Sequence, residues 1–211
     1  MYSGLAANPD LRGHTILSVG ACDASGYAEE ARASNHPCAG RRKQDNQDYI
    51  DGIIRASPSI RYAIIDGLRR VPRDDYIASL KARIDFLEAR GIRVIVFKPH
   101  LYPGFHLRAC YPNRTGRPPR DCSFDPAEAG KIAADFEPLV RAIGKSNPRV
   151  LFFDQNALYC QEREGRCSFL RQGLPLNRDQ VHFSEFAAAR LAENFVAWAR
   201  LSAPELAGPG G

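Results

Sequence analysis

The chain has 211 residues, 44% of them hydrophobic, and a formal net charge of +5; this length is enough for one α/β domain with a sizeable core. No run approaches the roughly 18 consecutive apolar residues of a transmembrane helix, and the polar start does not predict a secretory signal. The basic residues are scattered and are not interleaved with aromatic residues, which argues against nucleic-acid binding.

Four short apolar runs, each followed by a turn or polar loop, predict buried strands. In chain order they are "TILSV" (15–19), "YAIID" (62–66), "RVIVF" (93–97) and "RVLFF" (149–153). Strands that are apolar along their whole length are typical of a parallel sheet covered on both faces.

Apolar residues at helical spacing predict helices between and after these runs. The predicted helices cover residues 41–56, 73–90, 126–144 and about 185–201. Gly91 suits the end of the second helix, and Ser184 suits the N-cap of the last. Strands alternating with helices predict a three-layer α/β fold, as one domain over residues 1–203 with a disordered tail at 204–211.

The six cysteines form three pairs of near neighbours in the sequence, and an even number suits disulfides in an oxidising compartment. Of the fifteen possible pairings we favour the local one, in which each bridge closes a short loop; free buried thiols are the alternative. The favoured bridges are Cys22–Cys38, Cys110–Cys122 and Cys160–Cys167. The second bridge would close the loop of residues 99–124, which is too long for a plain connection.

Candidate site residues follow the predicted strands, because sites in open parallel sheets form at the carboxyl ends of strands. His182 lies in a loop before the last helix, and Asp179 precedes it by three residues. Such a histidine can act as a general base, and the carboxylate can hold its other ring nitrogen. Gly20, Gly67 and Arg69 follow the first two predicted strands and are candidates for stabilising an oxyanion. As an alternative, the glycines are turn residues and Asp-x-x-His is a chance pair.

The order of these pieces resembles the SGNH hydrolase domain that is fused to acyltransferase-3 membrane proteins. The resemblance covers almost the whole chain and is carried by "ILSVGAC", "YAIIDGLRR", "GIRVIVFKPHLYP", "VLFFDQNALYC" and "LNRDQVHFSEFAAARLA". It implies that His182 is the base, that Asp179 orients it and that Gly20 is the oxyanion glycine. In the third block Gly67 matches, but Arg69 stands where SGNH enzymes in general have an asparagine.

The family's nucleophile is the serine of a Gly-Asp-Ser block, and this sequence contains no Gly-Asp-Ser. The resemblance therefore implies an N-terminally truncated domain, inactive as it stands, whose serine lies before residue 1. Ser18 and Ser25 are poor substitutes because neither is expected at a tight strand-to-helix turn. The family's strand order is 2-1-3-4-5, so the missing strand would be a central one, with "TILSV" and "YAIID" as its neighbours.

The resemblance implies acyl transfer, most simply O-acetylation, to a hydroxyl group of an extracytoplasmic polysaccharide. It also implies attachment to a multi-span membrane domain at the periplasmic face. No metal or organic cofactor is needed for this chemistry, and a glycan or other hydroxyl acceptor is the expected partner. The alternative is a non-catalytic remnant that binds carbohydrate or docks a partner.

Overall fold

A computed structural model describes residues 2–20, 22, 24–25, 38–112, 119–161 and 165–207. The chain divides into two compact units, where a single domain over residues 1–203 was expected. The sheet unit contains Ser18–Pro99 and Ala133–Phe153, and the terminal unit contains Met1–Leu17, His100–Ile132 and Asp154–Gly211. Each unit combines segments that are far apart in the sequence.

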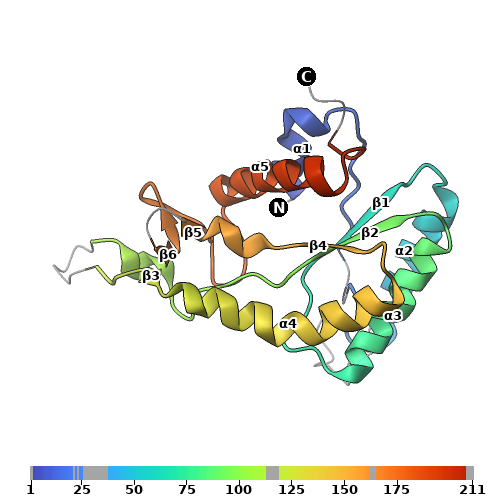
Figure 1. Ribbon diagram of the computed structural model, residues 1–211, viewed down its shortest axis with the longest axis horizontal. Coiled ribbons are helices and arrows are strands. Elements are labelled where there is room, and N and C mark those ends of the chain that lie inside the picture. Colours follow the sequence, from blue (N-terminus) through green and yellow to red (C-terminus); the bar gives the residue numbers. More distant parts are fainter. Residues whose placement is uncertain are drawn as a thin grey trace. The chain divides into compact units, whose positions relative to one another are not determined.

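The sheet unit is built on three parallel strands in the order β1-β2-β4. These strands are β1 (Tyr62–Ile65), β2 (Arg93–Phe97) and β4 (Leu151–Phe153), and they lie together in Figure 1. Each falls within one of the predicted apolar runs. The α/β class and the parallel sheet are therefore confirmed.

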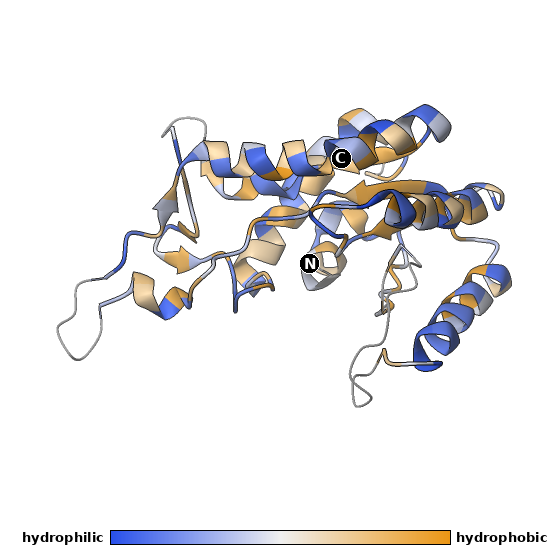
Figure 2. Ribbon diagram, turned by 90° about the horizontal axis from the view of Figure 1, so that it is seen from below, coloured by the Kyte–Doolittle hydropathy of each residue, from blue (hydrophilic) through white to orange (hydrophobic). Residues whose placement is uncertain are grey.

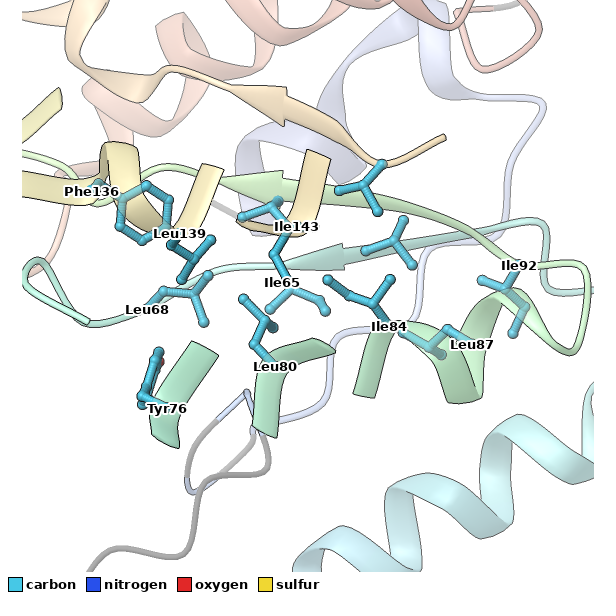
Figure 3. Close-up of a cluster of buried hydrophobic side chains, with 13 residues drawn as sticks. Ile65, Leu68, Tyr76, Leu80, Ile84, Leu87, Ile92, Phe136, Leu139 and Ile143 are labelled. Atoms are coloured by element: carbon cyan, nitrogen blue, oxygen red, sulfur yellow. The ribbon is translucent and has the colours of Figure 1, made fainter. Parts of the chain in front are cut away.

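One face of this sheet is covered by helices α3 (Asp74–Glu88) and α4 (Pro126–Ser146). Figure 3 shows their apolar side chains directed at the strands. The helical members of this hydrophobic cluster include Leu80, Ile84, Leu87, Phe136, Leu139 and Ile143, which meet Ile65, Val94 and Val96 of the strands. The three strand residues lie on the same face because strand side chains alternate between faces. At full burial, each such side chain contributes roughly 1.5–3 kcal/mol.

Helix α3 ends where the sequence predicts. Gly91 has a φ of 74°, a left-handed conformation that glycine adopts without strain. The backbone N–H of Ile92 donates to the carbonyl of Leu87, which closes the end of the helix. This turn leads directly into β2 and so sets where that strand begins.

Helix α2 (Arg42–Ala56) also forms where predicted, but it has no buried residue among those the structure describes. Tyr49 is one of the apolar residues whose helical spacing predicted this helix, yet it is 63% exposed. Ile54 is the member of the predicted face that packs against the hydrophobic cluster. Figure 2 shows the first half of the helix in hydrophilic colours, in agreement with its charged sequence "RKQDNQD".

The strand predicted at 15–19 is wrong. Residues 15–20 have no regular secondary structure, and Leu17 is 64% exposed. An extended segment becomes a strand only when a neighbour pairs with its backbone groups. Among the described residues β1 pairs with β2 alone, and residues 15–20 form no ladder with either strand.

The terminal unit pairs the first helix of the chain with the last. Helix α1 (Tyr2–Ala7) packs against α5 (Glu185–Ser202), and Figure 1 shows the two side by side. The contact is tight at Gly4, where an added Cβ would overlap the backbone carbonyl of Ala188. Helix α5 begins at the predicted N-cap, since Ser184 Oγ accepts from the N–H of Ala187.

The rest of the terminal unit consists of short 3-10 helices and strands that the sequence did not reveal. The 3-10 helices are η1 (Pro9–Leu11), η2 (Leu107–Cys110) and η3 (Gln155–Leu158). A small antiparallel sheet contains β3 (Ser123–Phe124), β6 (Arg166–Ser168) and β5 (Cys160–Gln161), and a hairpin joins β7 (Leu170–Arg171) to β8 (Leu174–Pro175). Strands of two or three residues have few backbone pairs and need other support.

That support includes disulfides, and the three predicted bridges are all present. Cys110–Cys122 joins η2 to the residue before β3, and Cys160–Cys167 crosses between β5 and β6. The third, Cys22–Cys38, belongs to the sheet unit. Disulfides persist in oxidising compartments, so the bridges indicate an extracytoplasmic domain. At the C-terminal end, Leu206 and Ala207 are buried, and the last four residues of the predicted tail lie outside the described ones.

Candidate active site

The Asp179–His182 pair lies in a tight loop immediately before α5. His182 Nδ1 is 2.8 Å from Asp179 Oδ2 and 3.0 Å from Oδ1. Asp179 Oδ1 also accepts from the backbone N–H groups of Val181 and His182, at 2.9 and 2.8 Å. One carboxylate therefore organises both the turn and the imidazole, which is possible because only two residues separate the pair.

The base of the loop is closed by the backbone. The N–H of Arg178 donates to the carbonyl of His182 at 2.8 Å, and Asn177 pairs with Phe183 in an antiparallel bridge. Next in the chain, Ser184 Oγ donates to the carbonyl of Pro175 at 2.6 Å while it caps α5. The loop thus projects from a closed neck fixed to the start of a packed helix.

The hydrogen bonds at Asp179 decide the state of both side chains. The backbone N–H of Val181 and then the His182 ring hold the pKa of the Asp179 carboxyl well below its usual range. An ionised carboxylate can only accept, so Nδ1 of His182 carries a hydrogen. In the neutral ring Nε2 then has the free lone pair, and this is the tautomer that can take a proton from a hydroxyl group.

Solvent reaches the pair. The side chains of His182 and Asp179 are 63% and 45% exposed. A second histidine lies beside the loop. Nε2 of His100 is 3.1 Å from the carbonyl oxygen of Val181, and its ring centroid is 4.4 Å from that of Phe183. His100 comes shortly after the third predicted strand, and its contact with this loop was not predicted.

The oxyanion candidates all belong to the sheet unit, whereas Asp179 and His182 belong to the terminal unit. The carbonyl of Gly20 accepts from Asn46 Nδ2 at 3.0 Å, and Asn46 Oδ1 accepts from the N–H of Cys22 at the same distance. Asn46 therefore fixes the backbone that follows residues 15–19. Whether Gly20 faces His182 stays a prediction.

Gly67 and Arg69 follow β1. Gly67 has a φ of 74°, which explains a glycine in this turn. The backbone N–H of Arg69 donates to the hydroxyl of Tyr76 at 3.2 Å, and its guanidinium lies 5.2 Å from the centre of that ring. The next residue, Arg70, forms an ion pair with Asp135 at 3.0 Å. Their assignment as oxyanion donors likewise stays a prediction.

Neither alternative serine resembles a nucleophile. Ser25 is completely buried. Ser18 lies among residues 15–20, which form no strand and lead into no helix at that point. A serine nucleophile needs an exposed oxygen at a strained strand-to-helix turn. Ser25 is not exposed, and Ser18 does not lie at such a turn.

Among the described residues, no group of three or more histidine, cysteine or acidic side chains is arranged to hold a metal ion. In the same residues no helix is long and apolar enough to cross a membrane.

Comparison with known proteins adds one finding. No curated protein matches the chain. A family model described as "SGNH domain (fused to AT3 domains)" matches residues 1–197. That match spans both units and includes Asp179 and His182, and the chain therefore belongs to the family of SGNH domains that are fused to acyltransferase-3 domains.

Proposed function

We propose that this domain takes part in O-acylation, most simply O-acetylation, of an extracytoplasmic polysaccharide, with His182 as general base and Asp179 as its orienting acid. The observation that carries the proposal is the contact of Asp179 with Nδ1 of His182, at 2.8 and 3.0 Å. Asp179 holds the hydrogen on Nδ1 and leaves Nε2 as the acceptor, and this arrangement is the one that acyl transfer through a serine requires.

The chemistry takes two steps. Nε2 of His182 accepts the serine hydroxyl proton as the serine oxygen bonds to the acyl carbon, and the protonated ring returns that proton to the departing group of the donor. The acceptor hydroxyl then loses its proton to Nε2 and attacks the acyl-serine ester, and the serine oxygen leaves with the proton. In both steps Asp179 stabilises the imidazolium, and Gly20, Gly67 and Arg69 are the proposed donors to the oxyanion.

The nucleophile in this proposal is a serine outside the 211 residues. The printed sequence has no Gly-Asp-Ser, and Ser18 and Ser25 are unsuited for the reasons given above. One structural feature supports a serine on a segment next to α1. Helix α1 packs against the first turns of α5, which directly follow His182.

The family supports the rest of the proposal. Its members are fused to acyltransferase-3 domains, so we place this domain beside a multi-span membrane acyltransferase, at the periplasmic face. The partner would deliver the acyl group, and a glycan would be the acceptor. The three disulfides agree with that side of the membrane.

The test begins with the reading frame that encodes the complete protein. A Gly-Asp-Ser within roughly a dozen codons before Met1 is expected. In that protein His182→Gln should lower kcat for acetyl transfer by about 10⁴–10⁶-fold, because the imidazole and the serine act as one unit. The matched control is His14→Gln, an exposed histidine of the same unit, which should leave kcat unchanged.

The 211-residue chain provides the complementary assay. It should show no serine-dependent hydrolysis of a simple acetyl ester, since loss of a triad nucleophile costs on the order of 10⁶ in turnover. Robust turnover that Ser18→Ala or Ser25→Ala abolished would place the nucleophile inside this chain. A complete protein without a serine nucleophile would favour the carbohydrate-binding or docking alternative.

A further inference from the structure

His100 contacts both residues that flank His182. It follows β2, 81 residues before Val181 in the sequence. Its Nε2 bonds to the carbonyl oxygen of Val181 at 3.1 Å, and its ring packs on Phe183 with centroids 4.4 Å apart and planes 33° apart. One side chain from a distant segment thus contacts the residue before the candidate base and the residue after it.

The hydrogen bond defines the state of His100. A carbonyl oxygen can only accept, so Nε2 of His100 carries a hydrogen and donates it to Val181. In the neutral ring the other nitrogen is then unprotonated. His100 and His182 therefore hold their hydrogens on opposite ring nitrogens, Nε2 in the first and Nδ1 in the second.

The ring contact links the loop to a buried network. Phe183 lies 6.2 Å from Tyr159, measured between ring centroids. The Tyr159 hydroxyl is buried and lies 2.7 Å from the carbonyl oxygen of Leu101, the residue after His100. The N–H of Leu101 in turn donates to Asn156 Oδ1 at 2.8 Å. Buried hydrogen bonds thus hold both the N–H and the carbonyl of Leu101, and they fix the backbone next to His100.

An anchor of this kind matters because the dyad itself is exposed. His182 and Asp179 orient each other, but their mutual hydrogen bonds do not fix where the pair points relative to the rest of the unit. The neck of the loop is closed at Asn177 and Phe183, while Val181 lies beyond the neck. The bond from His100 to Val181 holds the part of the loop that the neck does not reach.

We propose that His100 is a positioning residue for His182, a role that rests on the proposed function of that base. His100 touches no reacting atom in this role. Its Nε2–H fixes the carbonyl of Val181, and the fixed backbone holds the His182 ring in the geometry that keeps Nδ1 on Asp179. The donor, and not the aromatic ring alone, provides the effect.

Two substitutions separate the donor from the ring. His100→Phe keeps an aromatic ring against Phe183 and removes the donor. His100→Gln removes the ring but places an amide N–H near the position of Nε2. The matched control is His106→Phe. His106 is an exposed histidine of the 99–124 loop, and its Nδ1 accepts from the N–H of Arg108 at 3.3 Å.

Nuclear magnetic resonance of the ¹⁵N-labelled 211-residue chain reads the effect without any activity. In the wild type the His182 ring should show the Nδ1–H tautomer and a proton resonance bonded to Asp179. His100→Phe should speed exchange of that proton with water at least about tenfold or broaden it beyond detection. His100→Gln and His106→Phe should retain it. A purely structural role would lower the melting temperature of His100→Phe while leaving the His182 tautomer and exchange unchanged, and that result would overturn the proposal.

Kinetics of the complete protein then distinguish the two proposals. His100→Phe should lower kcat by about 10-fold or more with little change in KM, and His100→Gln should restore most of the loss. If His182→Gln left turnover intact while His100→Phe still released the Nδ1 proton, the proposed function would fail and the positioning role would stand. If His182→Gln abolished turnover and His100→Phe changed neither kcat nor the proton, the positioning role alone would fail.

Discussion

The hydrophobic cluster of the sheet unit and the Asp179–His182 loop of the terminal unit are stabilised in opposite ways. Leu80, Ile84 and Phe136 are completely buried and have no polar atoms to satisfy. Asp179 and His182 are largely exposed and are held by hydrogen bonds within a four-residue turn. We therefore expect substitutions in the cluster to change the free energy of unfolding, and substitutions in the loop to change catalysis with little effect on that free energy. Substitutions in the two regions can test this division.

The largest loss of stability is expected in the cluster. Leu80→Ala should reduce the free energy of unfolding by about 2–5 kcal/mol, because it removes apolar contacts and leaves a cavity. Urea denaturation measures this change in the free energy of unfolding. Leu201→Ala, at a side chain 88% exposed on α5, should change the value by no more than about 0.5 kcal/mol. Similar losses in both variants would mean that Leu80 is not in a packed core.

The second effect concerns the disulfides of the terminal unit. Replacing both Cys110 and Cys122 by serine should cost about 2–4 kcal/mol through the freed loop. Hydrogen exchange should show faster exchange in η2 and β3, while the amides of β2 remain protected. Equal loss of protection in β2 would show that the two units unfold together and would remove the distinction between them.

A smaller effect is expected where α1 meets α5. Gly4→Ala should destabilise the chain by about 1–3 kcal/mol, because the new methyl group meets the backbone carbonyl of Ala188 and cannot be relieved by a side-chain rotation. Gly144→Ala in α4 has open space around the added Cβ and should stabilise by about 0.5–1 kcal/mol. The two substitutions are chemically identical, so opposite signs in thermal melts would isolate the helix contact.

The loop should show almost no effect on folding and a large one on turnover. Asp179→Asn leaves the size of the side chain unchanged but allows an amide to donate to Nδ1, which favours the wrong tautomer of His182. The urea midpoint should stay close to the wild type, and kcat of the complete protein should fall by about 10⁴-fold. If Asp179→Asn clearly lowered stability and left turnover normal, the loop would be a structural element and not a catalytic one.

The smallest expected effect is the change in stability with pH that comes from the Asp179 carboxyl. Its carboxyl pKa is lower in the folded chain than the usual value of about 3.9. The folded state thus gains stability from the ionised carboxylate above about pH 4, and this gain is lost only as the pH falls through the lower, folded value. The gain is small because solvent screens an exposed carboxylate. A carboxyl ¹³C titration should find Asp179 still ionised at pH 3.9. Half-protonation at that pH would contradict the hydrogen bonds from Val181 and His182.

The sequence alone determined the features that depend on residues close together in the chain. Helical spacing located α3 and α4, Ser184 marked the start of α5, and Gly91 marked the end of α3. The disulfide partners followed from their closeness in sequence, since a short loop brings them together at little entropic cost. The contact between Asp179 and His182 was predictable for the same reason, because three positions are enough to close a turn.

Only the tertiary structure decided the features that need a distant partner. "TILSV" has the composition of a strand, but a strand exists only beside a neighbour that takes its hydrogen bonds, and among the described residues this segment is part of no ladder. Tyr49 has helical spacing but is exposed, because burial depends on what packs against the helix. His100 reached the His182 loop across 81 positions. No periodicity encodes such contacts, since they arise from the way in which separate segments pack.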